Sequence, residues 1–121
     1  MQKGGTKDFG FCRVSMVHAD HPSTWDQGEE KMSRYAGHAC GFVINIPHYN
    51  FKIYHAGDTN LFSDMRLINA FYKPDVLLLP IGDVLGMGPL QAAYAARHFL
   101  PDSKILVPMH FNGAACLTGT T

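Results

Sequence analysis

Apolar residues occur in short runs that are separated by charged and turn-forming residues. Five of these runs are predicted to be strands. The strand-like segments are residues 9–17, 41–46, 51–54, 76–79 and 104–108. Turn residues from Pro47 to Asn50 separate the second segment from the third, which predicts a β-hairpin.

Two other segments space their apolar residues as a helix does. The first, residues 64–72, follows the N-cap candidates Ser63 and Asp64. Its expected apolar face consists of Met65, Leu67, Ile68, Phe71 and Tyr72. The second begins at Pro89 and ends before Pro101, because proline suits a first helical turn and interrupts a later one. Its expected inward residues are Leu90, Ala93, Tyr94 and Ala96.

The predicted order is three strands, a helix, a strand, a helix and a last strand, which is typical of an α/β domain with a mixed sheet. Residues 20–37 are rich in polar residues, glycine and proline, and are predicted to be a long loop. The sequence contains no repeat and no boundary-like segment, so residues 1–121 are predicted to be a single domain.

Composition narrows the functional classes. Hydrophobic residues make up 46% of the 121 residues and charged residues 17%, which indicates a folded globular chain. Ten basic and ten acidic residues balance without a basic stripe, so we expect no nucleic-acid or membrane partner. Cys12, Cys40 and Cys116 form no CxxC pair, which favours a reducing, cytoplasmic compartment.

Candidate chemistry lies just after three of the strand-like segments. His21, Asp58 and His110 are all of metal-ligand type, and sites in α/β folds are built at the carboxyl ends of strands. Taken singly, each has a plain structural explanation, since Asp58 could cap its turn and His110 could be a core histidine. Their shared position at strand ends favours a metal site that uses a small-molecule substrate.

The glycine-rich segment 82–88 has two interpretations. It can be a tight turn that lets Pro89 start a helix, or a set of backbone amides that binds an anionic group at that helix start. It lacks the lysine and serine or threonine of a phosphate loop. Gly82, Asp83 and Gly88 are therefore candidate pocket residues.

Four segments in order resemble the metallo-β-lactamase superfamily, in its branch of metal-dependent hydrolases related to ascorbate-phosphate lactonase. They are segments 54–59 (YHAGDT), 79–82 (LPIG), 87–89 (MGP) and 107–110 (VPMH). The resemblance extends to Asn112, and the residues after Asn112 resemble neither the family nor a final helix.

The resemblance implies an αββα sandwich with a two-metal site between its sheets, and this chain corresponds to the C-terminal half: a mixed sheet with two helices. It implies that His21 and His110 are ligands of different ions, that Asp58 bridges both, and that Asp58 and His110 are the catalytic pair. His55 would lie behind the ligands. The ions would activate water, with Zn as first choice and Mn, Fe or Ni as alternatives.

The family's first ligand motif, His-x-His-x-Asp-His, complicates this alignment. Segment 16–21 (MVHADH) matches that motif with its first histidine replaced, which would make His18, Asp20 and His21 ligands. Asp58 follows His21 by only 37 residues, which is short for that arrangement. The preferred alignment therefore lacks the first motif, and His18 and Asp20 are only candidate pocket residues.

The leading hypothesis is a metal-dependent hydrolase of the ester, lactone or phosphoester class whose site is incomplete in this chain alone. The alternative is a non-catalytic remnant that keeps the fold and binds a partner, and a third possibility is a purely structural domain. A half-sandwich would leave apolar surface exposed, so we expect self-association or association with a missing N-terminal half.

Overall fold

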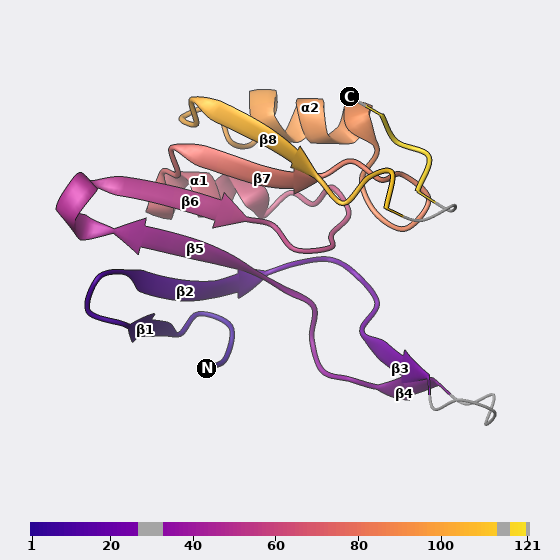
Figure 1. Cartoon of the computed structure of the whole chain (residues 1–121), viewed down its shortest axis with the longest axis horizontal. Coiled ribbons are helices and arrows are strands. Elements are labelled where there is room, and N and C mark those ends of the chain that lie inside the picture. The colour runs from indigo at the N-terminus through magenta and orange to yellow at the C-terminus, as the bar shows by residue number, and fades with distance from the viewer. Residues whose placement is uncertain (27–32, 114–116, 121) are drawn as a thin grey trace.

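The computed structural model describes residues 1–26, 33–113 and 117–120. Its main feature is one six-stranded sheet with the strand order β1-β2-β5-β6-β7-β8 (Figure 1). The strands of this sheet are β1 (Thr6–Asp8), β2 (Arg13–His18), β5 (Cys40–Ile46), β6 (Phe51–His55), β7 (Val76–Pro80) and β8 (Ile105–Met109). A separate antiparallel pair, β3 (Thr24–Asp26) and β4 (Ser33–Tyr35), extends from one end of the sheet.

The sheet is mixed, as the sequence predicted. Strands β1, β2, β5 and β6 pair antiparallel, whereas β6, β7 and β8 pair parallel. Parallel neighbours need a crossover connection. Helices α1 (Met65–Tyr72) and α2 (Pro89–His98) lie in the two crossovers and cover the same face of the sheet, behind it in Figure 1.

The core lies between this face and the two helices. Alternate strand residues point into it because successive side chains leave a strand on opposite sides. Its most deeply buried members are Val43, Tyr54, Leu77 and Leu79 from the sheet and Met65, Ala92 and Ala95 from the helices. Among the described residues, no helix is long and apolar enough to cross a membrane.

Two predicted boundaries were wrong. The first strand-like segment, residues 9–17, is interrupted by a turn in which the Phe9 amide donates to the Cys12 carbonyl, so β1 precedes it and β2 starts only at Arg13. Gly10 permits this turn with a φ of 84°, and its amide donates to Asp8 Oδ1. The predicted loop 20–37 contains β3 and β4, and residues 27–32 lie outside the described part.

The predicted helix positions were confirmed, but their inward faces were only partly right. On α1, Met65 and Ile68 are buried as expected, while Leu67 and Phe71 are exposed. On α2, the expected Leu90 and Tyr94 are exposed, and the buried residues are instead Ala92 and Ala95. Small alanine side chains let a helix pack close to the sheet, and this outweighs the greater apolarity of the larger residues.

Asp75 joins the three parallel strands at their starting ends. Its amide donates to the Lys52 carbonyl, and its own carbonyl accepts the amides of Lys104 and Ile105. Its carboxylate accepts the Lys52 amide at 3.0 Å and faces the Lys104 ammonium at 3.3 Å. The Lys52 amide, followed by Lys104, holds the pKa of the Asp75 carboxyl below its usual value.

The turn after β6 depends on a glycine. Gly57 has a φ of 69°, in the left-handed region that side chains other than glycine rarely adopt. A Cβ at this position would lie 2.5 Å from the Cys40 carbonyl oxygen of β5. The sheet and the following residue, Asp58, can therefore approach each other only because position 57 has no side chain.

We expect Asp75→Ala to lower the free energy of unfolding by about 1–3 kcal/mol at neutral pH, the usual cost of losing hydrogen bonds to a charged group. Because the folded pKa is depressed, this stabilisation is present above the unfolded value near 3.8 and is lost as pH falls through the folded pKa. Urea denaturation of both proteins between pH 7 and pH 3 measures the difference.

The matched control for Asp75 is Asp8→Ala, which removes a carboxyl with a lowered pKa from an exposed pair with Arg13. Exposed pairs contribute little, so its loss should be smaller than that of Asp75→Ala. Equal losses in the two variants, or a loss at Asp75 that does not change with pH, would contradict the role assigned to Asp75.

We expect Gly57→Ala to destabilise the chain by about 2–4 kcal/mol, because left-handed strain adds to a backbone clash. Gly4→Ala is the matched control, since Gly4 has a φ of 83° but no atom lies within 4 Å of the place its Cβ would take. It should cost only the strain, about 1 kcal/mol. Thermal denaturation of both variants tests the difference, and similar losses would show that the approach to Cys40 is not what fixes this turn.

Candidate functional site

Asp58 and His110 face each other at the carboxyl-end edge of the parallel strands. Asp58 follows β6 by three residues, and His110 follows β8 directly. His110 Nε2 lies 3.6 Å from Asp58 Oδ2, and the two side chains are 39% and 51% exposed. The structure thus brings together the predicted catalytic pair and leaves both groups open to a ligand from solvent.

The Asp58 turn is fixed by the residue that follows it. Thr59 is fully buried, and its hydroxyl accepts the Asp20 amide at 3.0 Å and donates to the Asn60 carbonyl at 2.9 Å. Its carbonyl accepts the Met87 amide at 3.1 Å. Two distant segments, at Asp20 and Met87, therefore hold the turn that carries Asp58.

His55 and Gly82 support the same edge. His55 Nδ1 accepts the Gly57 amide at 3.1 Å, so its ring orients the turn that carries Asp58. Gly82 is buried against the His110 carbonyl, where a Cβ would clash. His110 itself has a φ of 54°, a left-handed conformation that is uncommon outside glycine and is often found at functional positions.

His21 does not join the pair. Its Nδ1 lies 2.7 Å from the Pro22 carbonyl oxygen and its Nε2 lies 2.8 Å from the Leu85 carbonyl oxygen. Carbonyl oxygens only accept hydrogen bonds, so a ring nitrogen that bonds one of them carries hydrogen. Each ring nitrogen of His21 faces a backbone carbonyl oxygen, and neither is directed at Asp58 or His110.

His18 and Asp20 do not assemble a first ligand motif with His21. His18 Nδ1 accepts the Lys3 ammonium at 2.8 Å, and its ring contacts Phe62 edge-on. Asp20 accepts the Asn60 side-chain amide at 3.4 Å, and its carbonyl accepts the Asn60 amide at 2.8 Å. Asp20 therefore stabilises the turn that carries Asp58, through its hydrogen bonds with Asn60.

The glycine-rich segment 82–88 is a closed turn. The amides of Asp83, Gly86, Met87 and Gly88 all donate within the chain: to the Met87 carbonyl, the Asp83 carbonyl, the Thr59 carbonyl and Gln91 Oε1. None of these four is available to an anion, which favours the turn interpretation over the anion-binding one. Asp83 has a φ of 63° and is exposed at the outer side of this turn.

A carboxylate and an imidazole are suitable ligands for a divalent ion, but this pair supplies only two of them. Catalytic zinc usually takes three protein ligands. Across residues 1–26, 33–113 and 117–120, no three His, Cys, Asp or Glu side chains lie close enough together to hold one ion. The predicted convergence of three ligands is therefore reduced to two, and the metal roles of His21, Asp58 and His110 remain predictions.

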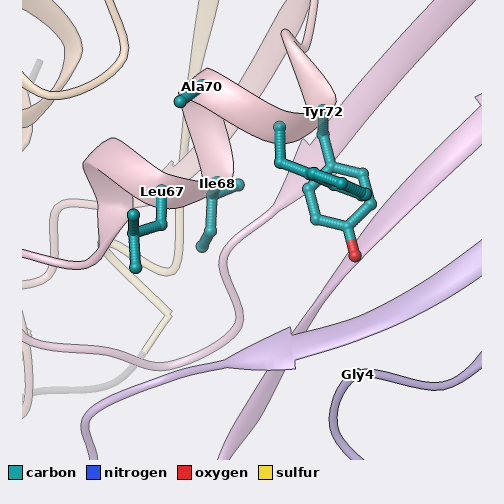
Figure 2. Close-up of a pocket in the computed structure, with 6 residues that line it drawn as sticks. Gly4, Leu67, Ile68, Ala70 and Tyr72 are labelled. Carbon is teal, nitrogen blue, oxygen red and sulfur yellow. The ribbon is translucent and has the colours of Figure 1, made fainter.

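An apolar groove lies elsewhere, between α1 and the N-terminal segment. Figure 2 shows Leu67, Ile68 and Tyr72 pointing from the helix to one side, with Gly4 across the groove. Apart from the Tyr72 hydroxyl, its side chains offer no acid, base or metal ligand. This groove therefore offers few groups for acid–base or metal chemistry.

Sequence reasoning missed the C-terminal segment. Leu117 is buried, and the Gly119 amide donates to the Gly82 carbonyl at 3.1 Å, so the chain returns to the edge that holds His110. Gly119 is packed so tightly against the Ile81 carbonyl that a side chain would not fit. The available signal was a single leucine followed two residues later by glycine.

The chain is similar to proteins that are named metal-dependent hydrolases. A metal-dependent hydrolase of Koribacter versatilis is 44% identical over 119 residues, which are 98% of this chain and 49% of the relative. One from Rubrobacter xylanophilus is 45% identical and covers 99% of this chain and 48% of the relative. The solved structure of the metallo hydrolase Igni18 from Ignicoccus hospitalis is 30% identical, with a TM-score of 0.78, and covers 99% of this chain and 48% of its own.

The chain thus spans about half the length of the curated relatives it matches. Matches over 98–99% of the chain also extend beyond Asn112, which corrects the expectation that the last residues lie outside the resemblance. The model of the beta-lactamase superfamily domain matches residues 1–111. The chain therefore belongs to the beta-lactamase superfamily, and its mixed sheet with two helices is about half of the metallo-β-lactamase fold.

Proposed function

We propose that this chain is part of a metal-dependent hydrolase domain and that Asp58 and His110 bind its divalent metal. The observation that carries the proposal is the 3.6 Å approach of an imidazole to a carboxylate at the carboxyl-end edge of parallel strands. The names of the relatives from Koribacter versatilis and Rubrobacter xylanophilus support it, since both are called metal-dependent hydrolases.

The remaining donors of the site are proposed to come from outside the described residues, which contain no group of three possible ligands. Two donors hold a metal weakly, because a catalytic ion usually needs three protein ligands. His21 becomes a third ligand only if its ring turns away from the Leu85 or Pro22 carbonyl. We infer that this chain alone hydrolyses poorly, and that zinc is the first metal to test, followed by manganese, iron and nickel.

A bound ion would supply Lewis-acid polarisation and an acidified water. The residues of this chain would hold and orient it: the Asp58 carboxylate and the His110 imidazole face the ion, and Thr59 keeps the Asp58 turn in place. The substrate is proposed to be a small molecule with an ester, lactone or phosphoester bond. The reducing, cytoplasmic setting predicted from the cysteines belongs to the same proposal.

A second candidate is a non-catalytic module that keeps the fold and binds a partner. The observation that favours it is the His21 ring, whose nitrogens lie against the Pro22 and Leu85 carbonyls, which is a structural role and not that of a ligand. The two candidates differ in what the Asp58–His110 pair does, and metal binding therefore separates them.

We expect Asp58→Asn and His110→Ala each to weaken zinc binding to the purified chain by at least about tenfold, because each removes one of two donors. Isothermal titration with zinc, together with an ester, lactone and phosphodiester panel, measures both properties. Asp64→Asn is the matched control, since Asp64 is an exposed carboxylate at the start of α1 and should leave binding unchanged.

Two outcomes would contradict the proposal. Zinc binding that is equal in the wild type, Asp58→Asn and Asp64→Asn would show that the pair is not a metal site and would favour the partner-binding module. Robust hydrolysis that survives Asp58→Asn would place the catalytic centre away from the Asp58 turn.

A further inference from the structure

The solvent side of α2 carries the larger apolar side chains of this helix. Leu90, Ala93 and Tyr94 are spaced three and four residues apart, so they form one stripe along the helix. Leu90 is 86% exposed and Tyr94 is 48% exposed, whereas the small residues Ala92 and Ala95 are buried against the core. A surface helix normally places polar residues on the side away from the core. The stripe is therefore a surface that a partner would cover.

A shallow groove of about 300 Å³ lies beside the stripe and is lined by Leu61, Leu90, Gln91 and Tyr94. Its polar groups are the Tyr94 hydroxyl and the Gln91 amide, and Gln91 Oε1 already accepts the Gly88 amide at 2.9 Å. Burying a charge without a partner is costly. The groove therefore suits an apolar side chain, such as a leucine or a tyrosine from a partner.

The C-terminal end of α2 is basic. Arg97 and His98 are exposed in its last turn. The guanidinium of Arg66 lies over the Phe99 ring, 4.4 Å from the ring centroid, and adds a second cation at this end. Asp102 follows shortly after the helix, and its carboxylate accepts a side-chain amide of α1 at 3.1 Å.

The N-terminal end of α2 is acidic. Asp83 is exposed, and its Oδ1 lies 3.2 Å from the place that a Cβ at Gly88, the first residue before the helix, would take. The Asp58 turn lies on the same side, because the Met87 amide donates to the Thr59 carbonyl. The two ends of α2 therefore differ in the sign of their charge, with the apolar stripe between them.

We propose that two copies of this chain associate through α2, with the two helices antiparallel about a two-fold axis. In such a pair the same patch serves both copies. Ala93 and Tyr94 lie at the centre of the contact, and Arg97 of each copy lies opposite Leu90 of the other. The Arg97 stem covers apolar surface there, while its guanidinium is directed toward the Asp83 end of the other helix. A parallel pair would instead place like charges together at each end.

The size of the surface sets the strength of the dimer. One face of a ten-residue helix is smaller than the roughly 800 Å² that each partner buries in a standard stable interface. We therefore expect a weak dimer, with a dissociation constant of about 10–100 μM. The paired charges set the antiparallel orientation and make the association sensitive to salt. The proposal concerns association and does not depend on the metal role of Asp58 and His110.

The first test compares the same change on the two helices. Analytical ultracentrifugation of the wild-type chain up to roughly 300 μM should show a dimer. Leu90→Lys should raise its dissociation constant by at least about tenfold, because the change places a second cation beside Arg97 of the other copy. Leu67→Lys is the matched control, since Leu67 is 66% exposed on α1, and it should leave the dissociation constant unchanged.

A second test locates the contact directly. A residue at the centre of an antiparallel pair meets its own counterpart, within the Cα separation of about 4.4–6.8 Å that a disulfide needs. Ala93→Cys should therefore give a cross-linked dimer on mild oxidation, measured by non-reducing gel electrophoresis. Ala70→Cys, at an exposed alanine of α1, is the matched control, and the wild-type chain shows the background from the native cysteines.

A third test reads the orientation. Arg97→Asp and Asp83→Arg should each raise the dissociation constant by at least about fivefold, because each places like charges opposite one another. The double variant exchanges the charges and should return the dissociation constant to within about twofold of the wild type. Far-ultraviolet circular dichroism checks that each variant is folded, and the exposed Ala93→Cys position carries the test if a charge variant does not fold.

Three results would overturn the proposal. One is a wild-type chain that stays monomeric throughout the concentration range, which would leave the stripe to a different protein. Another is cross-linking of Ala93→Cys that does not exceed that of Ala70→Cys, or an equal effect of Leu90→Lys and Leu67→Lys, which would place any contact away from α2. The third is a double charge variant that associates no better than the single variants, which would exclude the antiparallel arrangement.

Discussion

The parallel pairing of β6, β7 and β8 is the constraint on which the site depends. Asp75, just before β7, is hydrogen-bonded to Lys52 in β6 and to Lys104 just before β8. The three strands therefore begin at the same level in the sheet. Strands of similar length that begin together also end together, and this places Asp58 and His110 at one edge. The register of the parallel strands brings the segments of Asp58 and His110 to the same edge, and the contacts of Gly57 and Thr59 then fix the Asp58 turn. The geometry of the pair is thus set by backbone pairing and turn contacts, and not by the Asp58 and His110 side chains themselves.

The sequence predicted what local patterns determine. Strand-like runs, the proline start of α2 and the polar residues at strand ends were enough for the sheet and for the Asp58–His110 pair. The inward face of α2 was wrong because apolarity does not reveal size, and Ala92 and Ala95 fit against the sheet where Leu90 and Tyr94 do not. The contacts of His21 could not be predicted, since its partners are the carbonyls of Pro22 and Leu85 and every residue has a carbonyl. The hairpin of β3 and β4 was not predicted, because residues 20–37 have the polar composition that is typical of loops.

The Asp58–His110 pair is exposed at the edge of the sheet and has no third donor among the described residues. Any group that covered this edge would reduce the 39% and 51% exposure of the His110 and Asp58 side chains. Charged interactions strengthen when water is removed, so access of water to this edge affects how strongly the pair can attract a cation.

The turn that carries Asp58 is already fixed by contacts inside the described chain, whereas His21 is not placed to bind an ion. Gly57 against Cys40, Thr59 with Asp20, and Thr59 with Met87 are contacts inside the described chain. The backbone that carries the Asp58 carboxylate is therefore in place before any metal binds, which reduces the ordering cost at the moment of binding. His21 is the opposite case, because its ring would have to turn away from the Pro22 or Leu85 carbonyl before that nitrogen could bind an ion. An ion that enters this edge should accordingly meet Asp58 and His110 first, and His21 would follow only if the gain from a third donor exceeds the loss of that carbonyl contact.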